Sequence, residues 1–246
     1  ASHCSRLRRP FGLDLPSFVL KGCFEPLLTS LEYIYNLPLN FGIFPDLWKM
    51  SKVTPLYKTG DKASISNYRP VVILSSPAKL FELIICKQIY TQIEPFIIDS
   101  NTVLEKVDLA PMSEKLQVDS VYTDFSKAFD TVNHVLLLKK LHKLGIAGHL
   151  YKWFKSYLSN RQLAVKIESF TSYKFIATSG VPQGSHLGLI LFLIFVNDVL
   201  TIFNDVQVLM FADDMKIYKA IRNINDCQTL SNNLFKLFAW CQENYL

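Results

Sequence analysis

Two adjacent aspartates, Asp213 and Asp214, interrupt the otherwise largely apolar stretch VLMFADDMKIYK at residues 208–219. Neighbouring like charges repel each other and resist burial, so a compensating partner is expected. A third carboxylate, Asp124, ends the strand-like segment VDSVYTD and would project beyond that strand. If the two segments lie side by side in one sheet, Asp124 and Asp213 should converge on divalent cations, because Mg²⁺ prefers carboxylate oxygens. Two such ions about 4 Å apart are suited to phosphoryl transfer.

Each of these features also has an ordinary structural explanation when it is taken alone. An Asp-Asp pair is usually a solvated turn or a helix cap. The stretch SGVPQGS at residues 179–185 places two glycines around Pro182 and Gln183 just ahead of an apolar helix pattern. Its backbone N–H groups could approach a nucleotide, but the same pattern is typical of a simple helix-entry turn. The combination of the features therefore carries more weight than any one of them.

The elements that must position these residues alternate between helical and strand-like patterns. Apolar spacing predicts helices at residues 17–40, 76–97, 132–146, 149–160, 187–196 and 225–243. Alternating and β-branched segments predict paired strands within residues 52–74, 162–180 and 206–220, and a strand that leads to Asp124. Residues 99–117 show weak periodicity and predict no element. The order favours an α+β fold with hairpins over regular βαβ units.

Composition limits the class of protein without choosing a function. The chain has 246 residues, 50% of them hydrophobic, which suits one large domain or two closely packed subdomains. A net charge of +5 is compatible with a polyanionic partner but is not diagnostic. Five cysteines without a CxxC pair favour a reducing intracellular compartment over a disulfide framework or zinc site. The apolar run at residues 187–196 stops at Asn197 and Asp198, which indicates a buried helix and no membrane span.

Four motifs that occur in a fixed order strengthen the functional interpretation of these single features. WKMSKVTPLYKTGDKASISNYRP precedes YTDFSKAFDTVNH, SGVPQGSHLG and FADD. Together they resemble the reverse transcriptases of non-LTR (LINE-type, jockey-like) retrotransposons, from about Leu20 onward. The resemblance implies a right-hand polymerase fold with fingers and palm, an antiparallel palm sheet packed on helices, and no thumb. Residues 1–105 would form the fingers and N-terminal helical region, and residues 106–246 the palm, ending before the primer grip and thumb.

The resemblance also implies roles for the carboxylates. In the family the Asp of TDFSKAFD and the first Asp of FADD hold two Mg²⁺ ions, which by motif match means Asp124 and Asp213 here, with Mn²⁺ as an alternative ion. Asp214 completes the set. The partners implied are an RNA template, a DNA primer and deoxynucleoside triphosphates. An intracellular ribonucleoprotein is expected, either nuclear or cytoplasmic.

Further residues match the family positions that contact the nucleotide. Phe129 matches a steric gate whose ring would collide with a ribose 2′-hydroxyl, although core packing explains it equally well. Gln183 and Gly184 match residues that line the incoming nucleotide and the template base. Arg69 and Lys58 match fingers residues that grip the triphosphate, and an Arg suits bidentate phosphate contacts.

Some features leave other functions open. The interval SNTVLEKVDLAPMSEKLQ at residues 100–117 lacks the Gln-Gly-Phe-Arg motif and the Ser-Thr pair that relatives carry. A catalytically decayed retroelement relic that binds nucleic acid is therefore the alternative. An RNA-dependent RNA polymerase shares the carboxylate logic, but Phe129 disfavours it. Asp130 and His134 are interpreted as a helix cap and an exposed imidazole, not as an acid–base pair.

Overall fold

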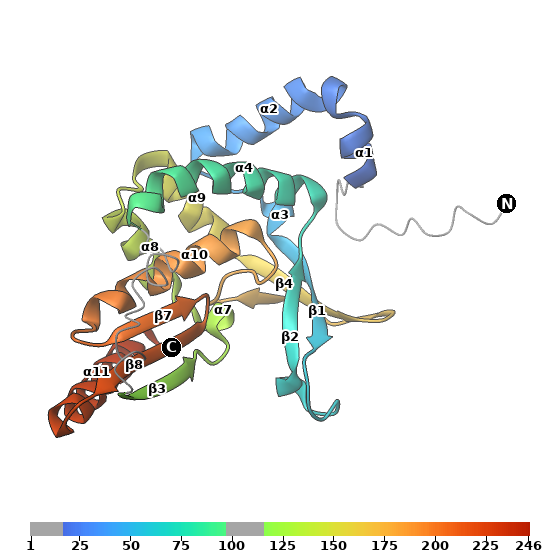
Figure 1. Ribbon diagram of the computed structural model, residues 1–246. Coiled ribbons are helices and arrows are strands. Elements are labelled where there is room, and N and C mark those ends of the chain that lie inside the picture. Colours follow the sequence, from blue (N-terminus) through green and yellow to red (C-terminus); the bar gives the residue numbers. More distant parts are fainter. Residues whose placement is uncertain (1–16, 97–115) are drawn as a thin grey trace. The chain divides into compact units, whose positions relative to one another are not determined.

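A computed structural model describes residues 17–96 and 116–246 of the chain (Figure 1). Most of the interval at residues 99–117, in which no element is predicted and the family motif is missing, lies outside the described residues. The described chain divides into two compact units that are discontinuous in sequence. Unit 1 comprises Ala1–Gln88, Leu141–Thr178 and Pro182–Leu189, and unit 2 comprises Ile89–Lys140, Ser179–Val181 and Ile190–Leu246. The assignment of residues 1–105 to fingers and residues 106–246 to palm stays a prediction.

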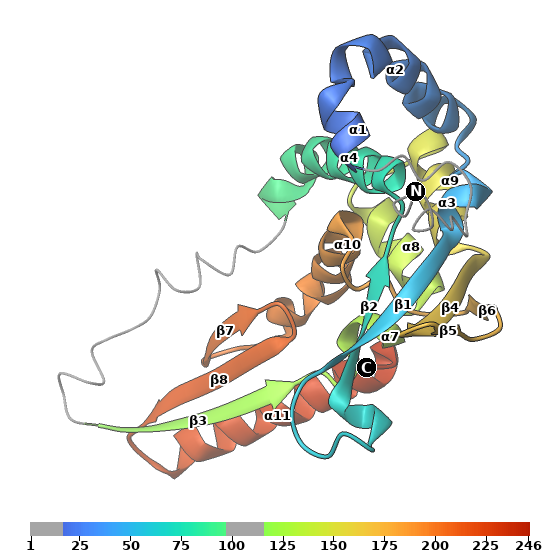
Figure 2. The same cartoon turned by 90° about the vertical axis from the view of Figure 1, so that its right-hand side faces the viewer.

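The strands of unit 1 form a mixed sheet. β1 (Met50–Tyr57) and β2 (Tyr68–Ile73) make a long antiparallel hairpin, which Figure 2 shows well. β1 also pairs in parallel with β4 (Arg161–Ile167). β4 pairs in addition with the short strands β5 (Phe170–Thr171) and β6 (Phe175–Ala177). The pairing of β1 with β4 therefore joins the β1–β2 hairpin to the rest of the sheet.

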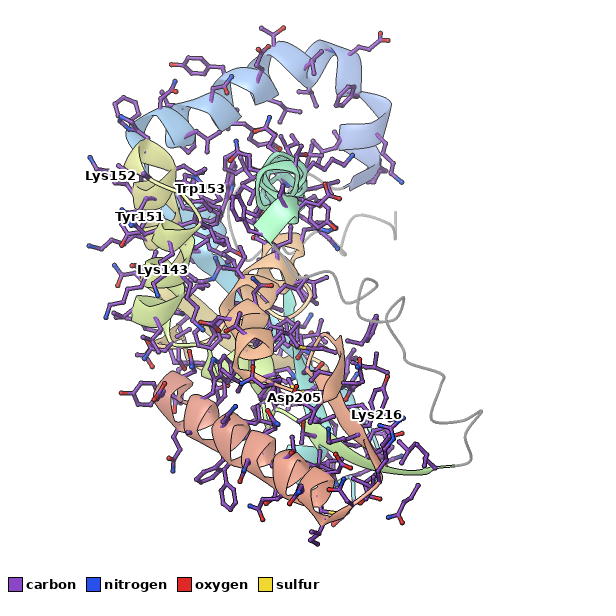
Figure 3. All side chains as sticks on the ribbon, turned by 60° about the vertical axis from the view of Figure 1, so that its left-hand side comes forward. Lys143, Tyr151, Lys152, Trp153, Asp205 and Lys216 are labelled. Atoms are coloured by element: carbon purple, nitrogen blue, oxygen red, sulfur yellow. The ribbon has the colours of Figure 1, made fainter. Side chains whose placement is uncertain are left out.

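Helices of unit 1 enclose an aromatic core. They are α1 (Ser17–Gly22), α2 (Phe24–Phe41), α3 (Asp46–Lys49), most of α4 (Ser76–Ile93) and α9 (Gly148–Leu158). α9 buries Trp153, which stacks on Tyr157 with ring centroids 5.6 Å apart, and it presents Lys152 to solvent (Figure 3). Burial of each large apolar side chain contributes roughly 2 kcal/mol. The aromatic residues of this core whose rings contact one another are Tyr35, Phe44, Trp48, Phe81, Trp153, Phe154 and Tyr157.

Unit 2 is built on a three-stranded antiparallel sheet. Its order is β3-β8-β7, with β3 at Gln117–Asp124, β8 at Asp214–Ile221 and β7 at Gln207–Phe211. α11 (Ile224–Asn244) packs on β8 and runs beside the sheet (Figures 1 and 2). A capping box between Asn223 and Asp226 starts this helix. The antiparallel sheet packed on helices confirms the predicted fold class.

Shorter helices complete unit 2. α7 (Ala128–Thr131) follows β3, and α8 (His134–Lys143) and α10 (His186–Val196) place most of their length in this unit. Lys140 on α8 forms an ion pair with Asp198 at 2.8 Å, and the Trp240 indole N–H donates to the same carboxylate at 3.2 Å. The partly buried Lys140 charge is therefore compensated within the unit.

Most of the predicted elements are confirmed, with local differences. The helix expected at residues 17–40 is interrupted at Cys23, so that it forms α1 and α2. The two strands expected at residues 162–180 become β4 and two short strands. The apolar helix α10 is buried as predicted. Within the described ranges no helix has both the length and the apolar character needed to cross a membrane.

Candidate active site

The ends of β3 and β8 bring two of the predicted carboxylates together. In the antiparallel ladder Asp124, the last residue of β3, lies directly opposite Asp214, the first residue of β8. Directly opposed residues of antiparallel strands have their Cα atoms about 5 Å apart and their side chains on the same face. Both aspartates are exposed. The sheet therefore opposes two carboxylates at one end without burying them.

Asp213 lies in the turn that joins β7 to β8. Phe211 pairs with Asp214, so the loop has two residues, Ala212 and Asp213. Ala212 has φ +54°, a left-handed conformation that is costly for a residue with a Cβ. Two-residue hairpin loops require positive φ at their first central position. Asp124 is thus paired with Asp214, and the expectation that it meets Asp213 stays a prediction.

The face that carries Asp124 and Asp214 also carries aromatic and basic side chains. Because side chains alternate along a strand, Tyr122 and Lys216 lie on this face, two residues from the aspartates. The Lys216 ammonium is 5.1 Å from the centre of the Tyr122 ring and 5.4 Å from that of Tyr218. Figure 3 shows Lys216 on β8. The opposite face is apolar and buried, with Met210, Met215 and Ile217.

The donor atoms suit Mg²⁺, but they do not form a closed metal cage. Among the described residues, no group of three or more His, Cys, Asp or Glu side chains is arranged to hold a metal ion. None of the ion pairs found in the described ranges involves Asp124, Asp213 or Asp214. Mg²⁺ commonly takes only one or two protein carboxylates and completes its shell with water and phosphate oxygens. Two opposed carboxylates therefore fit this ion, provided that a substrate supplies further ligands.

The first part of the SGVPQGS loop, Ser179–Val181, is fixed to the segment that follows Asp124. The N–H of Val181 donates to the Phe129 carbonyl at 2.7 Å, and the N–H of Gly180 donates to the Val132 carbonyl at 2.8 Å. Gly180 has φ +83°, and a Cβ there would stand 2.8 Å from backbone atoms of Asp130 and Phe129. Glycine is required at this position because the backbones approach so closely.

The second part of the loop belongs to unit 1 and lies against β2. The N–H of Val72 donates to the carbonyl of Gln183 at 2.7 Å. Gly184 has φ +102°, and a Cβ there would stand 3.1 Å from the Val72 carbonyl oxygen. β2 also carries Arg69, which is exposed and pairs with Leu56 of β1. Lys58 is exposed at the end of the same hairpin, where its N–H donates to the Asn67 carbonyl.

The predicted site residues are thus divided between the units. Lys58, Arg69, Gln183 and Gly184 belong to unit 1, whereas the three aspartates and Phe129 belong to unit 2. The partly exposed ring of Phe129 stacks on Phe192 of α10, with centroids 4.6 Å apart and planes 26° apart. Packing and a steric gate are both compatible with this position, so the gate stays a prediction.

The interpretation of Asp130 and His134 needs a correction. The side chain of Asn133, not Asp130, caps α8, because its oxygen accepts from the N–H groups of Val135 and Leu136 at 2.9 and 3.1 Å. The His134 ring is not a free surface imidazole, since its Nε2 lies 2.7 Å from the Gly180 carbonyl oxygen. Burial raises the pKa of the Asp130 carboxyl, and Lys127 partly offsets that effect. His134 therefore helps to hold the loop.

The sequence patterns did not single out a polar cluster inside unit 1. Glu82 on α4 is fully buried, and its Oε1 accepts a hydrogen bond from the Tyr157 hydroxyl at 2.9 Å. Arg161 is 2% exposed and its guanidinium lies over the Tyr157 ring, 4.7 Å from the centroid. A signal was present in the sequence, because Glu82 occupies a helical position four residues after Ala78, within the apolar face of α4.

The fold and the opposed carboxylates define a class of nucleic-acid polymerase. Residues 58–246 match the family described as reverse transcriptase (RNA-dependent DNA polymerase), so the chain belongs to the reverse transcriptase family. This family uses divalent metal ions.

Curated relatives narrow the comparison to mobile elements. The chain is 31% identical to the probable RNA-directed DNA polymerase from transposon BS of Drosophila melanogaster, over 96% of this chain and 29% of that protein. It is 30% identical to the RNA-directed DNA polymerase from mobile element jockey of the same species, over 81% of this chain and 24% of that protein. The chain thus spans less than a third of the length of these relatives. The predicted resemblance to jockey-like non-LTR retrotransposon reverse transcriptases is confirmed.

Solved structures support the fold at low sequence identity. The telomerase of Candida tropicalis, in complex with a fragment of telomeric RNA, superimposes with a TM-score of 0.57 over 84% of this chain and 41% of that one. The telomerase of Candida albicans gives a TM-score of 0.55 over 91% of this chain and 44% of that one. Both are 11% identical, so the likeness concerns the fold, which is consistent with a fingers–palm polymerase.

Proposed function

We propose that this chain is the catalytic part of an RNA-directed DNA polymerase of a retrotransposon, which adds deoxynucleotides to a DNA primer on an RNA template. The observation that carries this proposal is the cross-strand pairing of Asp124 with Asp214 beside the turn that holds Asp213. Opposed carboxylates on an exposed sheet face gain nothing from each other, but they gain from a shared cation. Family membership supplies the reaction class.

Asp124, Asp213 and Asp214 would hold two Mg²⁺ ions, or Mn²⁺ in their place. Bound there, the ions would supply activation of the primer 3′-hydroxyl and stabilisation of the leaving pyrophosphate oxygen. The aspartates' own contribution is to present oxygen donors from a rigid strand end and a tight turn. Because Asp124 and Asp214 are exposed and Asp213 is partly exposed, a substrate can reach the carboxylates, and the site can assemble when the nucleotide arrives.

The nucleotide contacts are assigned residue by residue. Arg69 would grip the triphosphate through its planar guanidinium, with Lys58 as an additional positive charge. Gln183 and Gly184 would line the nucleotide and the template base, and the Phe129 ring would exclude a ribose 2′-hydroxyl. Residues 1–105 and 106–246 would act as fingers and palm, respectively.

The partners follow from the same reaction. They are an RNA template, a DNA primer and deoxynucleoside triphosphates, and the RNA in the telomerase complexes is in keeping with the first of these. A ribonucleoprotein in the nucleus or the cytoplasm is the expected setting.

Primer extension tests the proposal directly. The chain is incubated with an RNA template, a DNA primer, deoxynucleotides and Mg²⁺, and Asp213→Asn should abolish extension. Asp205→Asn is the matched control, because Asp205 is an exposed aspartate of the same unit that precedes β7 (Figure 3). Extension that survives Asp213→Asn, or that Asp205→Asn removes equally, would refute the assignment.

A second function is a retroelement relic that binds nucleic acid without catalysis. It is favoured by the interval at residues 100–117, which lacks the Gln-Gly-Phe-Arg motif and the Ser-Thr pair of the family. Salt-sensitive RNA binding without nucleotide incorporation would support it. An RNA-dependent RNA polymerase is the third candidate, and comparison of ribonucleotide with deoxynucleotide incorporation in wild type and Phe129→Ala separates it.

A further inference from the structure

Glu82 is a buried carboxylate in unit 1 whose surroundings fix its orientation. It is 0% exposed and lies on α4 beside the aromatic core. Burial raises the pKa of Glu82, while the positive charge of Arg161 and the hydrogen bond from Tyr157 act in the opposite direction. Its Oε2 has no hydrogen-bond partner among the described residues. A buried carboxylate is costly, so its presence calls for a role beyond filling the core.

The neighbours of Glu82 lead to the second part of the SGVPQGS loop. The Tyr157 hydroxyl that donates to Glu82 lies 3.5 Å from the Ser185 Oγ. The Ser185 hydroxyl and the Leu187 N–H also lie close enough to Glu82 to lower its pKa. In turn, the Ser185 Oγ accepts a hydrogen bond from the Gly188 N–H at 2.7 Å. Glu82 is therefore linked to the start of α10 by the side chains of Tyr157 and Ser185 and by the Leu187 N–H.

The loop is confined on its other side by β2. The Gln183 carbonyl accepts from the Val72 N–H at 2.7 Å, and a Cβ on Gly184 would stand 3.1 Å from the Val72 carbonyl oxygen and 3.2 Å from the Val71 side chain. A Cβ on Gly188 of α10 would collide with the Pro182 carbonyl oxygen of the loop. Gln183 and Gly184 thus contact β2 on one side and are followed directly by Ser185, which belongs to the Glu82 group.

We propose that Glu82 is a positioning residue, which holds Gln183 and Gly184 in place through Tyr157 and Ser185 and so sets the affinity for the incoming deoxynucleotide. The inference rests on the proposed function, because it takes the nucleotide role of these two loop residues as given. It predicts that loss of the carboxylate affects nucleotide binding more than the chemical step. Residues that hold a binding group in position act in this way when they do not touch the reacting atoms.

The kinetic test separates KM from kcat. Glu82→Gln keeps the side-chain volume and the acceptor for Tyr157 but removes the charge that faces Ser185 and the Leu187 N–H. We expect the deoxynucleotide KM to rise about tenfold, as for a lost hydrogen bond to a charged group, with kcat changed less than about twofold. Tyr157→Phe should raise KM in the same direction, because it removes the hydroxyl between Glu82 and Ser185.

Phe81→Leu is the matched control. Phe81 precedes Glu82 on α4, is equally buried and stacks on Tyr35, but it has no polar group that could reach the loop. It should lower the unfolding free energy and leave the deoxynucleotide KM unchanged. An unchanged KM in Glu82→Gln, or an equal rise in KM in Phe81→Leu, would overturn the proposal.

Hydrogen exchange gives a readout that does not depend on activity. The amides of Gly188 and Val72 report on the loop, since they donate to Ser185 and Gln183. In Glu82→Gln both should exchange about tenfold faster, while amides of β8 keep their wild-type rates. If the wild type incorporates no nucleotide, the proposed function is refuted, and the exchange rates in Glu82→Gln still test the positioning role. If the wild type is active but these exchange rates are unchanged in Glu82→Gln, only the positioning role is refuted.

Discussion

The carboxylates of this chain occupy two opposite environments. Asp124 and Asp214 face each other on an exposed sheet end, whereas Glu82 is fully buried beside Arg161 and Tyr157. The exposed pair adds little to stability and is accessible to a cation. The buried one is bound into the protein and is inaccessible. The difference in burial is the basis for the two proposed roles, cation binding for the exposed pair and placement of a loop for Glu82.

The largest expected effect is a loss of activity without a loss of stability when the exposed pair of Asp124 and Asp214 is changed. Asp124→Asn should reduce Mg²⁺-dependent nucleotide incorporation by roughly 10³-fold or more, because the proposed function makes Asp124 a metal ligand. The free energy of unfolding should not fall, since the change removes one of two opposed like charges. Single-nucleotide incorporation and urea unfolding measure the two quantities. A marked loss of stability would contradict the contrast drawn above.

The buried carboxylate should behave in the opposite way. Glu82→Leu leaves Arg161 without its nearby negative charge and the Tyr157 hydroxyl without its acceptor, so the unfolding free energy should fall by about 3 kcal/mol. Adding Arg161→Met should recover part of this loss, because the unpaired charge is then removed as well. Urea unfolding of the two single variants and the double variant completes the cycle. Strict additivity would show that Glu82 and Arg161 are not coupled.

Patterns in the sequence predicted the elements of the exposed site because that site is made of local features. The alternation before Asp124 and the apolar residues around Asp213 predict β3, β7 and β8, and their ends then carry the acids. The pairing of Asp124 with Asp214 depends on the register between β3 and β8, two strands far apart along the chain, which no local turn sets. The two-residue turn at Ala212 and Asp213, with its left-handed alanine, fixes only the register between β7 and β8.

The buried group could not be predicted in the same way. Glu82, Tyr157 and Ser185 are 75 and 28 residues apart along the chain, and only tertiary packing brings them together. The contact of Gly180 with Asp130 is likewise a long-range approach of two backbones. The sequence shows a glycine there, but a glycine in a turn is common and does not reveal what lies against it.

A smaller loss of stability is expected at Gly180, where two backbone segments approach each other closely. Gly180→Ala should lower the unfolding free energy by about 2 kcal/mol, from left-handed strain plus collision with the backbone of Phe129 and Asp130. Gly145→Ala is the matched control, because Gly145 has φ +84° but nothing within 4 Å of a Cβ. Its loss should be only about 1 kcal/mol. Equal losses in thermal or urea unfolding would mean that the contact with the segment after Asp124 adds nothing.

The smallest effect concerns pH and again separates Glu82 from the exposed pair. Since burial raises its pKa above the ordinary value of 4.5, folded Glu82 binds a proton that the unfolded chain has already released. Its contribution to stability is therefore full below pH 4.5 and is lost as the pH rises through the folded pKa. Tyr157 and Cys86 do not titrate in this window, because burial and the Glu82 charge raise the pKa of both, that of Cys86 to about 12.

Glu82→Gln should remove this pH dependence. Above pH 4.5 the wild type should progressively lose unfolding free energy relative to the variant, which has no proton to release. The raised pKa of Asp130 contributes with the same sign in both proteins and cancels in the difference. Urea unfolding at a series of pH values gives the two curves. Parallel curves would mean that Glu82 keeps its ordinary pKa in the folded chain, and with it that Arg161 fully offsets the cost of burial.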